Sequence, residues 1–382
     1  MTGSLQVKKN TYYAVLNFRD KEGKRKQKWI STQLPIKGNK RKADALLNEL
    51  IAQYRDTAYI EPTKILLCDF ITEWVTGRKS HVQITTYDAY LHMLDKHIYP
   101  YFQQLGITVH QVKPIHIQQY HTSKMQEGLS PNTVIKHHAI IRTALQQAVK
   151  QGIIKENIAD YVDKPKKQRF VATIYNKDEI NQLFAVVKGT PIETVVLLTT
   201  YFGLRRSETL GLKWSCIDFV GKTISINHKV GRAKIDGKLT FLQTDDLKTP
   251  TSYRTLPLAT PILDYLISLK EKQAANMKLC GSDYVQEFKD YICVNEIGDL
   301  LKPDYVSGKF NKILNKYELK HIRFHALRHS CASLLLSLGY SMKDIQEYLG
   351  HASYQTTANI YAHIDPKNKK NMISGISNAL TL

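Results

Sequence analysis

The sequence GLRRSE at residues 203–208 begins a series of four short segments in the C-terminal half of the chain. The second is KTPTSYR at residues 248–254, which we place in a turn between two expected strands. The third is HALRH at residues 325–329, and the fourth comprises LGH at residues 349–351 and YAH at residues 361–363. Each segment alone is ordinary, because paired arginines often lie on a solvated helix face and the chain has 22 tyrosines. Their order along one chain needs an explanation.

These side chains suit the transfer of a phosphodiester without a metal ion. A phosphate in the transition state holds negative charge on its non-bridging oxygens, and fixed cations stabilise it. Arginines supply planar, permanently charged guanidinium groups for those oxygens, and histidine can donate a hydrogen bond or move a proton. A lysine can protonate the leaving 5′ oxygen if neighbouring cations lower its pKa. A tyrosine hydroxyl, with an ordinary pKa of about 10, becomes a nucleophile when cations favour its phenolate.

A metal site is the alternative explanation for His325 and His329, which are four residues apart. In the HExxH pattern of zinc enzymes a glutamate follows the first histidine, but here the residue is Ala326. Arg328 would also place a cation beside the ion. We therefore expect no metal and no other cofactor at this site.

The composition of the whole chain points to nucleic acid. The 382 residues include 54 Lys and Arg against 34 Asp and Glu, a formal net charge of +20. This charge favours DNA or RNA as the partner, with an anionic membrane surface as the second choice. No apolar run approaches the roughly 18 to 20 residues that span a bilayer, and the N-terminus has no signal-peptide pattern. Five scattered cysteines without a CxxC pair fit reduced thiols, so we expect a cytoplasmic protein without a membrane partner.

Residues 1–60 predict a small domain of three strands and a helix. Alternation marks strands at residues 11–19 and 24–31, and residues 4–8 add a third. An apolar stripe at residues 43–54 marks a helix that starts near Asn39 and covers one sheet face. The other face should be basic and interleaved with aromatic residues, which favours DNA binding. Lysines that only keep the domain soluble are the alternative. The candidate DNA contacts are Lys24, Arg25, Lys26 and Lys28, with Tyr12, Tyr13 and Trp29 among them.

Residues 65–163 predict a helical domain that could clamp duplex DNA. Residues 86–98 form a helical pattern that we expect to end before Pro100. Ser130 and Pro131 form a typical helix start, and that helix should run to Gly152. Its core stripe is Val134, Ile141, Leu145 and Val149, whereas Lys136, His137, Arg142 and Lys150 should lie largely off the stripe. Lys136 and Arg142 are candidate DNA contacts.

A basic linker is expected at residues 164–172, and it precedes a C-terminal domain at residues 173–382. The linker begins KPKKQR, in which Lys164, Lys166, Lys167 and Arg169 are candidate phosphate contacts. The expected fold is thus multidomain and mainly α with α+β parts, and its α-rich last domain contains a small antiparallel sheet. We expect helices at residues 176–187 and 192–201 and beyond Pro261, with strands at residues 223–226, 239–243 and 254–258.

The four segments resemble those of the tyrosine recombinase (phage integrase) family. GLRRSE is similar to the family's first arginine box, HALRH to its H-x-x-R-H box, and LGH with a tyrosine ten residues after the histidine to its nucleophile segment. KTPTSYR falls where the family keeps its lysine. Upstream, KHIYPYFQQLG, GLSPNTV and AVKQGIIKEN resemble the helical domain that binds core DNA. Residues 1–60 resemble the arm-type DNA-binding domain of lambda-like and conjugative-transposon integrases. Phe202, Ala326 and Ile158 depart from common family residues, at positions without assigned chemistry.

The resemblance implies a catalytic set, a reaction and partners. Tyr361 would attack a DNA phosphate and form a 3′-phosphotyrosine without ATP, and a homotetramer would exchange strands through a Holliday junction to integrate and excise a mobile element. Double-stranded DNA with core and arm sites is the implied substrate, and an excisionase and a DNA-bending host protein are implied partners. Glu208 and His329 would support the set without contacting the reacting atoms. The other implied catalytic residues are Arg205, Lys248, His325, Arg328 and His351.

Three alternatives stand beside this function. A type IB topoisomerase uses the same chemistry, but the arm-like domain and the short, linked helical domain argue against it. A chromosome-dimer resolvase of the same family would normally lack residues 1–60. A basic DNA-binding regulator without catalysis would explain the charge but not the ordered set of arginines, histidines, lysine and tyrosine.

Overall fold

The computed structural model describes residues 2–19, 25–55, 64–168, 173–235, 238–245 and 250–350. The chain divides into two compact units, one of residues 1–83 with 89–167 and the other of residues 84–88 with 168–382. The division at residues 167 and 168 lies within the stretch for which we predict a linker. Among the described residues, no helix has the length and apolar character needed to cross a membrane.

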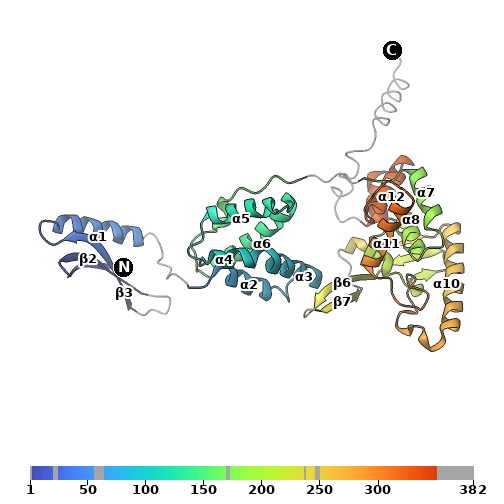
Figure 1. Ribbon diagram of the computed structural model, residues 1–382, viewed down its shortest axis with the longest axis horizontal. Helices are drawn as coiled ribbons and strands as arrows, with labels where there is room; N and C mark the ends of the chain where they lie inside the picture. The colour runs from blue at the N-terminus through green and yellow to red at the C-terminus, as the bar shows by residue number, and fades with distance from the viewer. Residues whose placement is uncertain are drawn as a thin grey trace, which may run out of the picture. The chain divides into compact units, whose positions relative to one another are not determined.

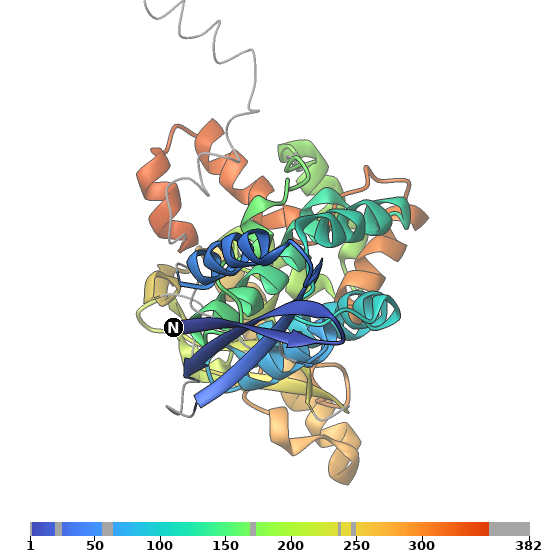
Figure 2. The same ribbon diagram turned by 90° about the vertical axis from the view of Figure 1, so that its left-hand side faces the viewer.

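The N-terminal segment is a three-stranded antiparallel sheet covered by one helix. Its strands are β1 (Thr2–Lys8), β2 (Thr11–Arg19) and β3 (Arg25–Pro35), in the order β1-β2-β3. Helix α1 (Lys40–Arg55) lies across one sheet face, as the views in Figures 1 and 2 show. Ala14 and Leu16 of β2 pack there against Leu47 of α1. The predicted strands and helix therefore form as expected.

The basic residues of β3 are divided between the two faces of this sheet. Directly paired residues of neighbouring strands point to the same face, and successive residues of a strand point to opposite faces. Lys28 pairs with Leu16 and therefore belongs to the face that α1 covers, whereas Trp29 pairs with Val15 and belongs to the open face. The prediction that the basic residues share one open face is therefore corrected. Lys26 and Lys28 belong to the covered face, and only Arg25 lies with Trp29 on the open face. Lys24 lies outside the described residues.

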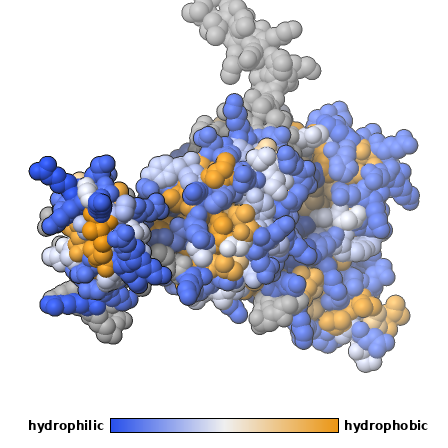
Figure 3. Space-filling view, turned by 60° about the vertical axis from the view of Figure 1, so that its left-hand side comes forward, coloured by the Kyte–Doolittle hydropathy of each residue, from blue (hydrophilic) through white to orange (hydrophobic). Residues whose placement is uncertain are grey.

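The open sheet face is partly aromatic. Trp29 is 50% exposed. Its ring centroid lies 6.4 Å from that of Tyr13, which is two residues from the pairing partner of Trp29, Val15, on β2 and therefore on the same face. Tyr12 is on the opposite face, with Ala14. The space-filling view shows an apolar patch among the hydrophilic residues of this segment (Figure 3).

The remainder of the first unit is helical, as predicted. Helix α6 begins at Pro131, and the Ser130 side chain accepts a hydrogen bond from the backbone N–H of Thr133. Of the predicted core stripe, Val134, Ile141 and Leu145 are buried, whereas Val149 is only half-buried. The helices at residues 64–168 are α2 (Leu67–Gly77), α3 (Ile84–Met93), α4 (Tyr99–Leu105), α5 (Pro114–Gln126) and α6 (Pro131–Lys150), with a 3-10 turn at Ile158–Tyr161.

Two predictions in this helical part are wrong. The helix expected to end before Pro100 continues through a π turn (Leu94–Ile98) into α4, where the proline occupies the first turn and its missing N–H costs little. His137, expected off the core stripe, is fully buried. The hydroxyl of Tyr120 lies 2.9 Å from its Nδ1, and the ring of His97 stacks on it at 5.1 Å. The Tyr120 hydroxyl thus provides a hydrogen-bond partner for Nδ1, whereas Nε2 is buried without one among the described residues.

The second unit is mainly helical with two small antiparallel sheets. Strands β5 and β8 match the predicted strands at residues 223–226 and 254–258, and β7 matches the one at residues 239–243. Strand β6, which pairs with β7, was not predicted. The strands are β4 (Ile217–Asp218), β5 (Thr223–Ile226) and β8 (Arg254–Pro257) in one sheet and β6 (Lys229–Ile235) and β7 (Lys238–Thr244) in the other. The helices are α7 (Lys177–Val187), α8 (Glu193–Phe202), α9 (Arg206–Leu210), α10 (Thr260–Cys280), α11 (Pro303–Lys316), α12 (Ala326–Ser337) and α13 (Met342–Leu349).

Close packing at Gly203 brings three helices of this unit together. Gly203 ends α8 in a left-handed conformation with φ of 57°. A Cβ atom there would lie 2.1 Å from Cδ2 of Leu349 in α13 and 3.3 Å from Sγ of Cys331 in α12. The absent side chain therefore lets α12 and α13 approach the turn between α8 and α9. This turn contains the GLRRSE segment.

Candidate active site

Arg205 lies at the start of α9 and is held there by Glu208. Its backbone N–H donates to Oε2 of Glu208 at 3.0 Å, and its guanidinium forms an ion pair with the same carboxylate. Glu208 is buried, whereas the Arg205 side chain is 25% exposed. Arg205, the residue just before α9, is therefore a cation that Glu208 holds in place and that remains partly accessible to solvent.

Arg328 approaches the same carboxylate from α12. Its Nη1 donates to the carbonyl of Gly203 at 2.6 Å, and its Nη2 donates to the carbonyl of Leu349 at 2.8 Å. Nη1 also lies 3.8 Å from Oε2 of Glu208. The side chain is only 1% exposed, so this charge is compensated almost entirely inside the protein.

Arg254 is a third arginine in the cluster and was assigned no role from the sequence. Its Nη2 donates to Oε2 of Glu208 at 3.2 Å, and its Nε donates to the carbonyl of Tyr348 at 3.0 Å. Its side chain is 7% exposed. The sequence signal was its position as the last residue of KTPTSYR and the first of the expected strand at residues 254–258.

The carboxylate of Glu208 is ionised because three guanidinium groups surround it. Burial alone would raise its pKa, but Arg254, Arg205 and Arg328, with the backbone N–H of Arg205, lower the pKa overall. Burial and Arg205 lower the pKa of Arg328 while Glu208 raises it, and the guanidinium remains charged at neutral pH. Three cations around one anion leave two net positive charges, 3 − 1 = 2. Such an excess attracts an anion to the accessible side of the cluster.

The same three arginines bind the C-terminal end of α13. Arg254, Arg328 and Arg205 donate to the carbonyls of Tyr348, Leu349 and Gly350, respectively, the last at 3.3 Å. The free carbonyls at a helix C-terminus bear partial negative charge, so cations stabilise this end. His351 follows directly on the last of these carbonyls. The arginine cluster therefore fixes the end of α13, directly before His351 in the chain, whereas His351 and Tyr361 lie outside the described residues.

His325 and His329 complete the described part of the predicted set. His325 immediately precedes α12 and is exposed, and its ring centroid lies 5.0 Å from that of His329. The protein atoms around the imidazole, and then the positive neighbours His329 and Arg328, lower the pKa of His325 to about 4. The imidazole is therefore neutral near pH 7 and can donate one hydrogen bond. Among residues described by the structure, no group of three or more His, Cys, Asp or Glu side chains is arranged to hold a metal ion.

Lys248 lies outside the described residues, but the chain on one side of it enters the arginine cluster. Ser252 is fully buried, and its hydroxyl accepts a hydrogen bond from Nη1 of Arg205 at 3.4 Å. Arg254 follows two residues later. The segment that contains Lys248 therefore ends at the same cluster as GLRRSE and HALRH.

The predicted DNA contacts outside this cluster occupy different surroundings. Arg25, Lys26, Lys136, Lys164, Lys166 and Lys167 are exposed, and Lys28 is half-buried. Arg142 forms an ion pair with Asp160, with 2.5 Å between Nε and Oδ1, so part of its charge is already compensated. Arg169 lies outside the described residues.

A mainly helical unit with three arginines around one buried carboxylate belongs to the class of proteins with a positively charged site that suits an anion such as a phosphate. Family comparison identifies the group within that class. The Phage integrase family matches residues 174–368, and its N-terminal SAM-like domain matches residues 66–125. The chain belongs to the phage integrase family, whose members are tyrosine recombinases, site-specific DNA strand-exchange enzymes. The family predicted from the four segments is thus confirmed.

Individual relatives agree with this membership. The chain is 26% identical to a "Tyrosine recombinase XerC-like" protein of Caldanaerobacter subterraneus subsp. tengcongensis, over 88% of this chain and 89% of that one. It is 24% identical to the "ICEBs1 integrase" of Bacillus subtilis, over 91% and 92% of the two chains.

Solved structures share the fold. The Tn1549 transposon integrase in complex with a circular intermediate DNA has a TM-score of 0.66 at 16% identity, over 82% of this chain and 100% of that one. A lambda integrase tetramer bound to a Holliday junction has a TM-score of 0.58 at 16% identity, over 93% and 94%. The predicted multidomain, mainly helical fold is confirmed.

Proposed function

We propose that the chain is the integrase of a mobile genetic element and that Tyr361 is its nucleophile. The tyrosine oxygen attacks a scissile DNA phosphate, the bond from phosphorus to the 5′ oxygen breaks, and a 3′-phosphotyrosine forms. The freed 5′ hydroxyl of a partner strand then attacks this ester and releases the tyrosine. Bond energy is kept in the ester, so no ATP and no cofactor are needed. The observation that supports this most is the gathering of Arg205 and Arg328 around Glu208, as the sequence predicts.

The described residues suggest a division of labour among the cations. Arg205 and His325 are accessible, so they contact the non-bridging oxygens of the phosphate. Arg328 is buried and contributes positive potential from beneath while it fixes the carbonyls of Gly203 and Leu349. Such fixed charges stabilise the transition state without reorganising during the reaction.

The roles of the remaining residues follow from the family resemblance, and of these Lys248 and His351 lie outside the described ranges. Lys248 donates a proton from its ammonium group to the leaving 5′ oxygen. His351 contacts the phosphate beside Tyr361, and His329 supports His325. Glu208 keeps the arginines in place and does not contact DNA.

The rest of the chain is proposed to bind DNA around this site. Residues 1–60 bind arm sites, residues 65–163 and the linker at 164–172 enclose core DNA, and residues 173–382 perform the chemistry. Arg25 with Trp29 and Tyr13 on the open sheet face would contact arm DNA. The active form is a homotetramer on DNA in the cytoplasm, and an excisionase and a DNA-bending host protein set the direction. The relatives named ICEBs1 integrase and Tn1549 integrase favour a mobile element as the source.

A covalent-adduct experiment tests the reaction. The protein is incubated with a nicked suicide substrate that contains its core site, and the products are separated under denaturing conditions. We expect an adduct from the wild type, none from Tyr361→Phe, and no effect of EDTA. An adduct that persists in Tyr361→Phe would refute the nucleophile, and inhibition by EDTA would revive the metal alternative.

A chromosome-dimer resolvase is the second candidate, because a relative over most of the chain is named XerC-like. Truncation of residues 1–60 separates the two functions. An element integrase should keep cleavage of core sites and lose affinity for distal arm sites. Unchanged affinity for distal sites would favour the resolvase.

A further inference from the structure

A hydrogen-bonded network outside the arginine cluster holds the chain just before Lys248. His228 is buried next to β6, and its Nδ1 lies 2.5 Å from the carboxylate of Asp245. A carboxylate only accepts, so this nitrogen holds the proton. The other ring nitrogen, Nε2, lies 2.9 Å from the hydroxyl of Tyr291, and that hydroxyl also lies 2.7 Å from Oε1 of Gln243, so its one proton can be donated to either of these acceptors. His228 thereby connects Asp245, which directly follows β7, with the buried Tyr291, and Tyr291 in turn contacts Gln243 in β7.

Asp245 has a second attachment through its backbone. The hydroxyl of Tyr253 donates to the carbonyl of Asp245. Asp245 is three residues before Lys248, and Tyr253 is five residues after it. The hydrogen bond therefore joins the two ends of the segment that contains the lysine.

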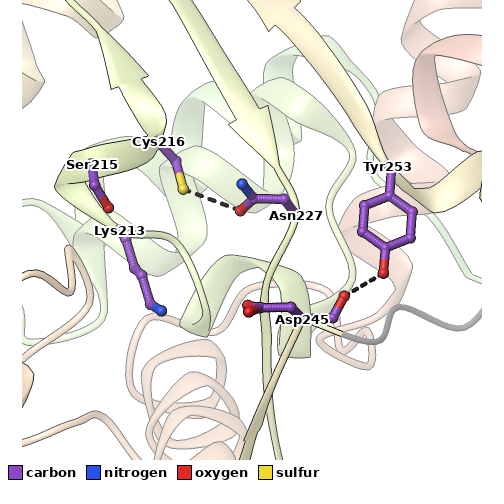
Figure 4. Close-up of a pocket in the computed structure, with 6 residues that line it drawn as sticks. All are labelled: Lys213, Ser215, Cys216, Asn227, Asp245 and Tyr253. Carbon is purple, nitrogen blue, oxygen red and sulfur yellow. Dashed lines mark hydrogen bonds between the residues drawn. The ribbon is translucent and has the colours of Figure 1, made fainter.

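Apolar packing does little to fix this position. The Asp245 side chain is 84% exposed, and it borders an open pocket of about 410 Å³ that Lys213, Ser215, Cys216, Asn227 and Tyr253 also line. In Figure 4, Asp245 and Tyr253 are joined by their hydrogen bond on one side of this pocket, opposite Ser215 and Cys216. Hydrogen bonds are therefore the main restraint on Asp245, in contrast to Ser252 at the far end, which is buried against Arg205.

We propose that His228 and Tyr291 are positioning residues for strand cleavage, because they hold Asp245, which is three residues before Lys248 in the chain. Neither residue belongs to the four segments defined in the sequence. The inference rests on the proposed function, in which Lys248 is the general acid. A displacement of about 1 Å in such a group can cost about a hundredfold in rate.

The test uses two DNA substrates in the full-length protein. One has an ordinary scissile phosphate, and the other has sulfur in place of the bridging 5′ oxygen. A thiolate leaves without protonation, so this substrate removes the need for a general acid. We expect Tyr291→Phe and His228→Gln to slow cleavage of the ordinary substrate by about tenfold to a hundredfold. With the sulfur substrate both should approach the wild-type rate, as Lys248→Ala should.

Controls separate positioning from general damage to the fold. Tyr265→Phe removes another tyrosine hydroxyl hydrogen bond of the same unit, 2.7 Å from Thr194, and should leave both rates unchanged. Tyr253→Phe removes the attachment at the exposed surface and should repeat the pattern of Tyr291→Phe even if the buried variants unfold. DNA binding and thermal unfolding are measured alongside.

Two results would overturn the inference, and they are distinguishable from failure of the proposed function. If sulfur rescues Lys248→Ala but not Tyr291→Phe, His228→Gln or Tyr253→Phe, the network does not act through the lysine. If the three variants cleave the ordinary substrate at the wild-type rate, the network positions nothing. If Lys248→Ala itself is not rescued, Lys248 is not the general acid, and this inference fails, whereas the role of Tyr361 is still decided by the covalent-adduct experiment.

Discussion

At the scale of single residues, the cluster depends on one carboxylate. Glu208 is the only acid whose contacts with Arg205, Arg254 and Arg328 are described. Glu208→Gln leaves three close cations without an anion, and breaking such a buried pair costs about 3–5 kcal/mol. We expect a loss of that size in the free energy of unfolding, measured by denaturant titration, together with loss of cleavage.

The control for this change is Glu271→Gln on the exposed surface of α10, which should alter stability by less than about 0.5 kcal/mol. Equal stability of the two variants would mean that the arginines do not need Glu208.

Gly203 makes a second prediction at this scale. Alanine there meets two costs, the left-handed conformation and a Cβ atom 2.1 Å from Leu349. The first cost is roughly 1–2 kcal/mol. The second displaces α13 and the carbonyls that Arg205, Arg254 and Arg328 bind, so we expect cleavage to fall with stability. Cleavage rate and melting temperature measure the two effects.

Gly189 offers a matched comparison, because its φ is 75° and nothing lies within 4 Å of a Cβ atom built there. Gly189→Ala should cost only the conformational part and leave cleavage intact. Equal losses in both variants would show that the approach of α13 to Gly203 is unimportant.

From the sequence, roles were assigned to three residues of the cluster but not to Arg254, although Arg254 is the last residue of the KTPTSYR segment. Arg205, Glu208 and Arg328 were found because their neighbours in sequence form recognisable groups. Arg254 was missed because its partners, Glu208 and the carbonyl of Tyr348, are 46 and 94 residues away. A partner that only the tertiary fold brings close leaves no local pattern.

At the scale of elements, the misses have similar causes. Strand β6 has no clean alternation in KVGRAKI, yet the Asp-Gly pair at residues 236–237 is a strong hairpin signal that would have predicted it. The helix end at Pro100 was mispredicted because proline is tolerated in the first turn of a helix. Capped, periodic helices such as α6 and α7 were predicted correctly, since their signals are local.

Helix α6 leads to a prediction on pH. Burial, followed by nearby cationic groups such as His97, Lys124 and His121, lowers the pKa of His137 to about 4. Burial and its neighbours His121, Lys164 and Arg142 lower the pKa of His138 to about 4, although Asp160 opposes this. An unfolded histidine has a pKa of about 6.5. As the pH falls, the unfolded state therefore takes up protons first, and stability is lost between about pH 6.5 and pH 4.

We expect the protection of α6 amides from hydrogen exchange in the full-length chain to decrease between pH 7 and pH 5, once corrected for intrinsic exchange. The loss should be on the order of 2 kcal/mol for each of the two histidines. His138→Leu should flatten this dependence, whereas His81→Leu at an exposed position should not. A dependence on pH that His138→Leu leaves unchanged would contradict the assignment.

At the scale of the whole molecule, the net charge of +20 serves two purposes that can be separated. The charges of the arginine cluster surround one buried carboxylate, leave two positive charges in excess and sit at the proposed site of chemistry. The exposed lysines of the predicted linker are solvated charges suited to phosphate contacts. Binding to duplex DNA releases about 0.9 counterions per neutralised phosphate, which sets the dependence of affinity on salt.

Replacing Lys164, Lys166 and Lys167 with alanine should therefore reduce the slope of log affinity against log salt by about 2 to 3, if each contacts one phosphate. Cleavage by the bound protein at saturating concentration should be unchanged. Arg205→Ala should leave the salt slope nearly unchanged, because it removes at most one phosphate contact. It should greatly reduce cleavage, because it removes the accessible cation that stabilises the transition state. The control replaces three exposed lysines that we do not place on DNA, Lys272, Lys278 and Lys289, with alanine. It should change neither the salt slope nor the cleavage rate. If this control reduces the salt slope as much as the linker variant, the affinity reflects total charge and not a placed linker.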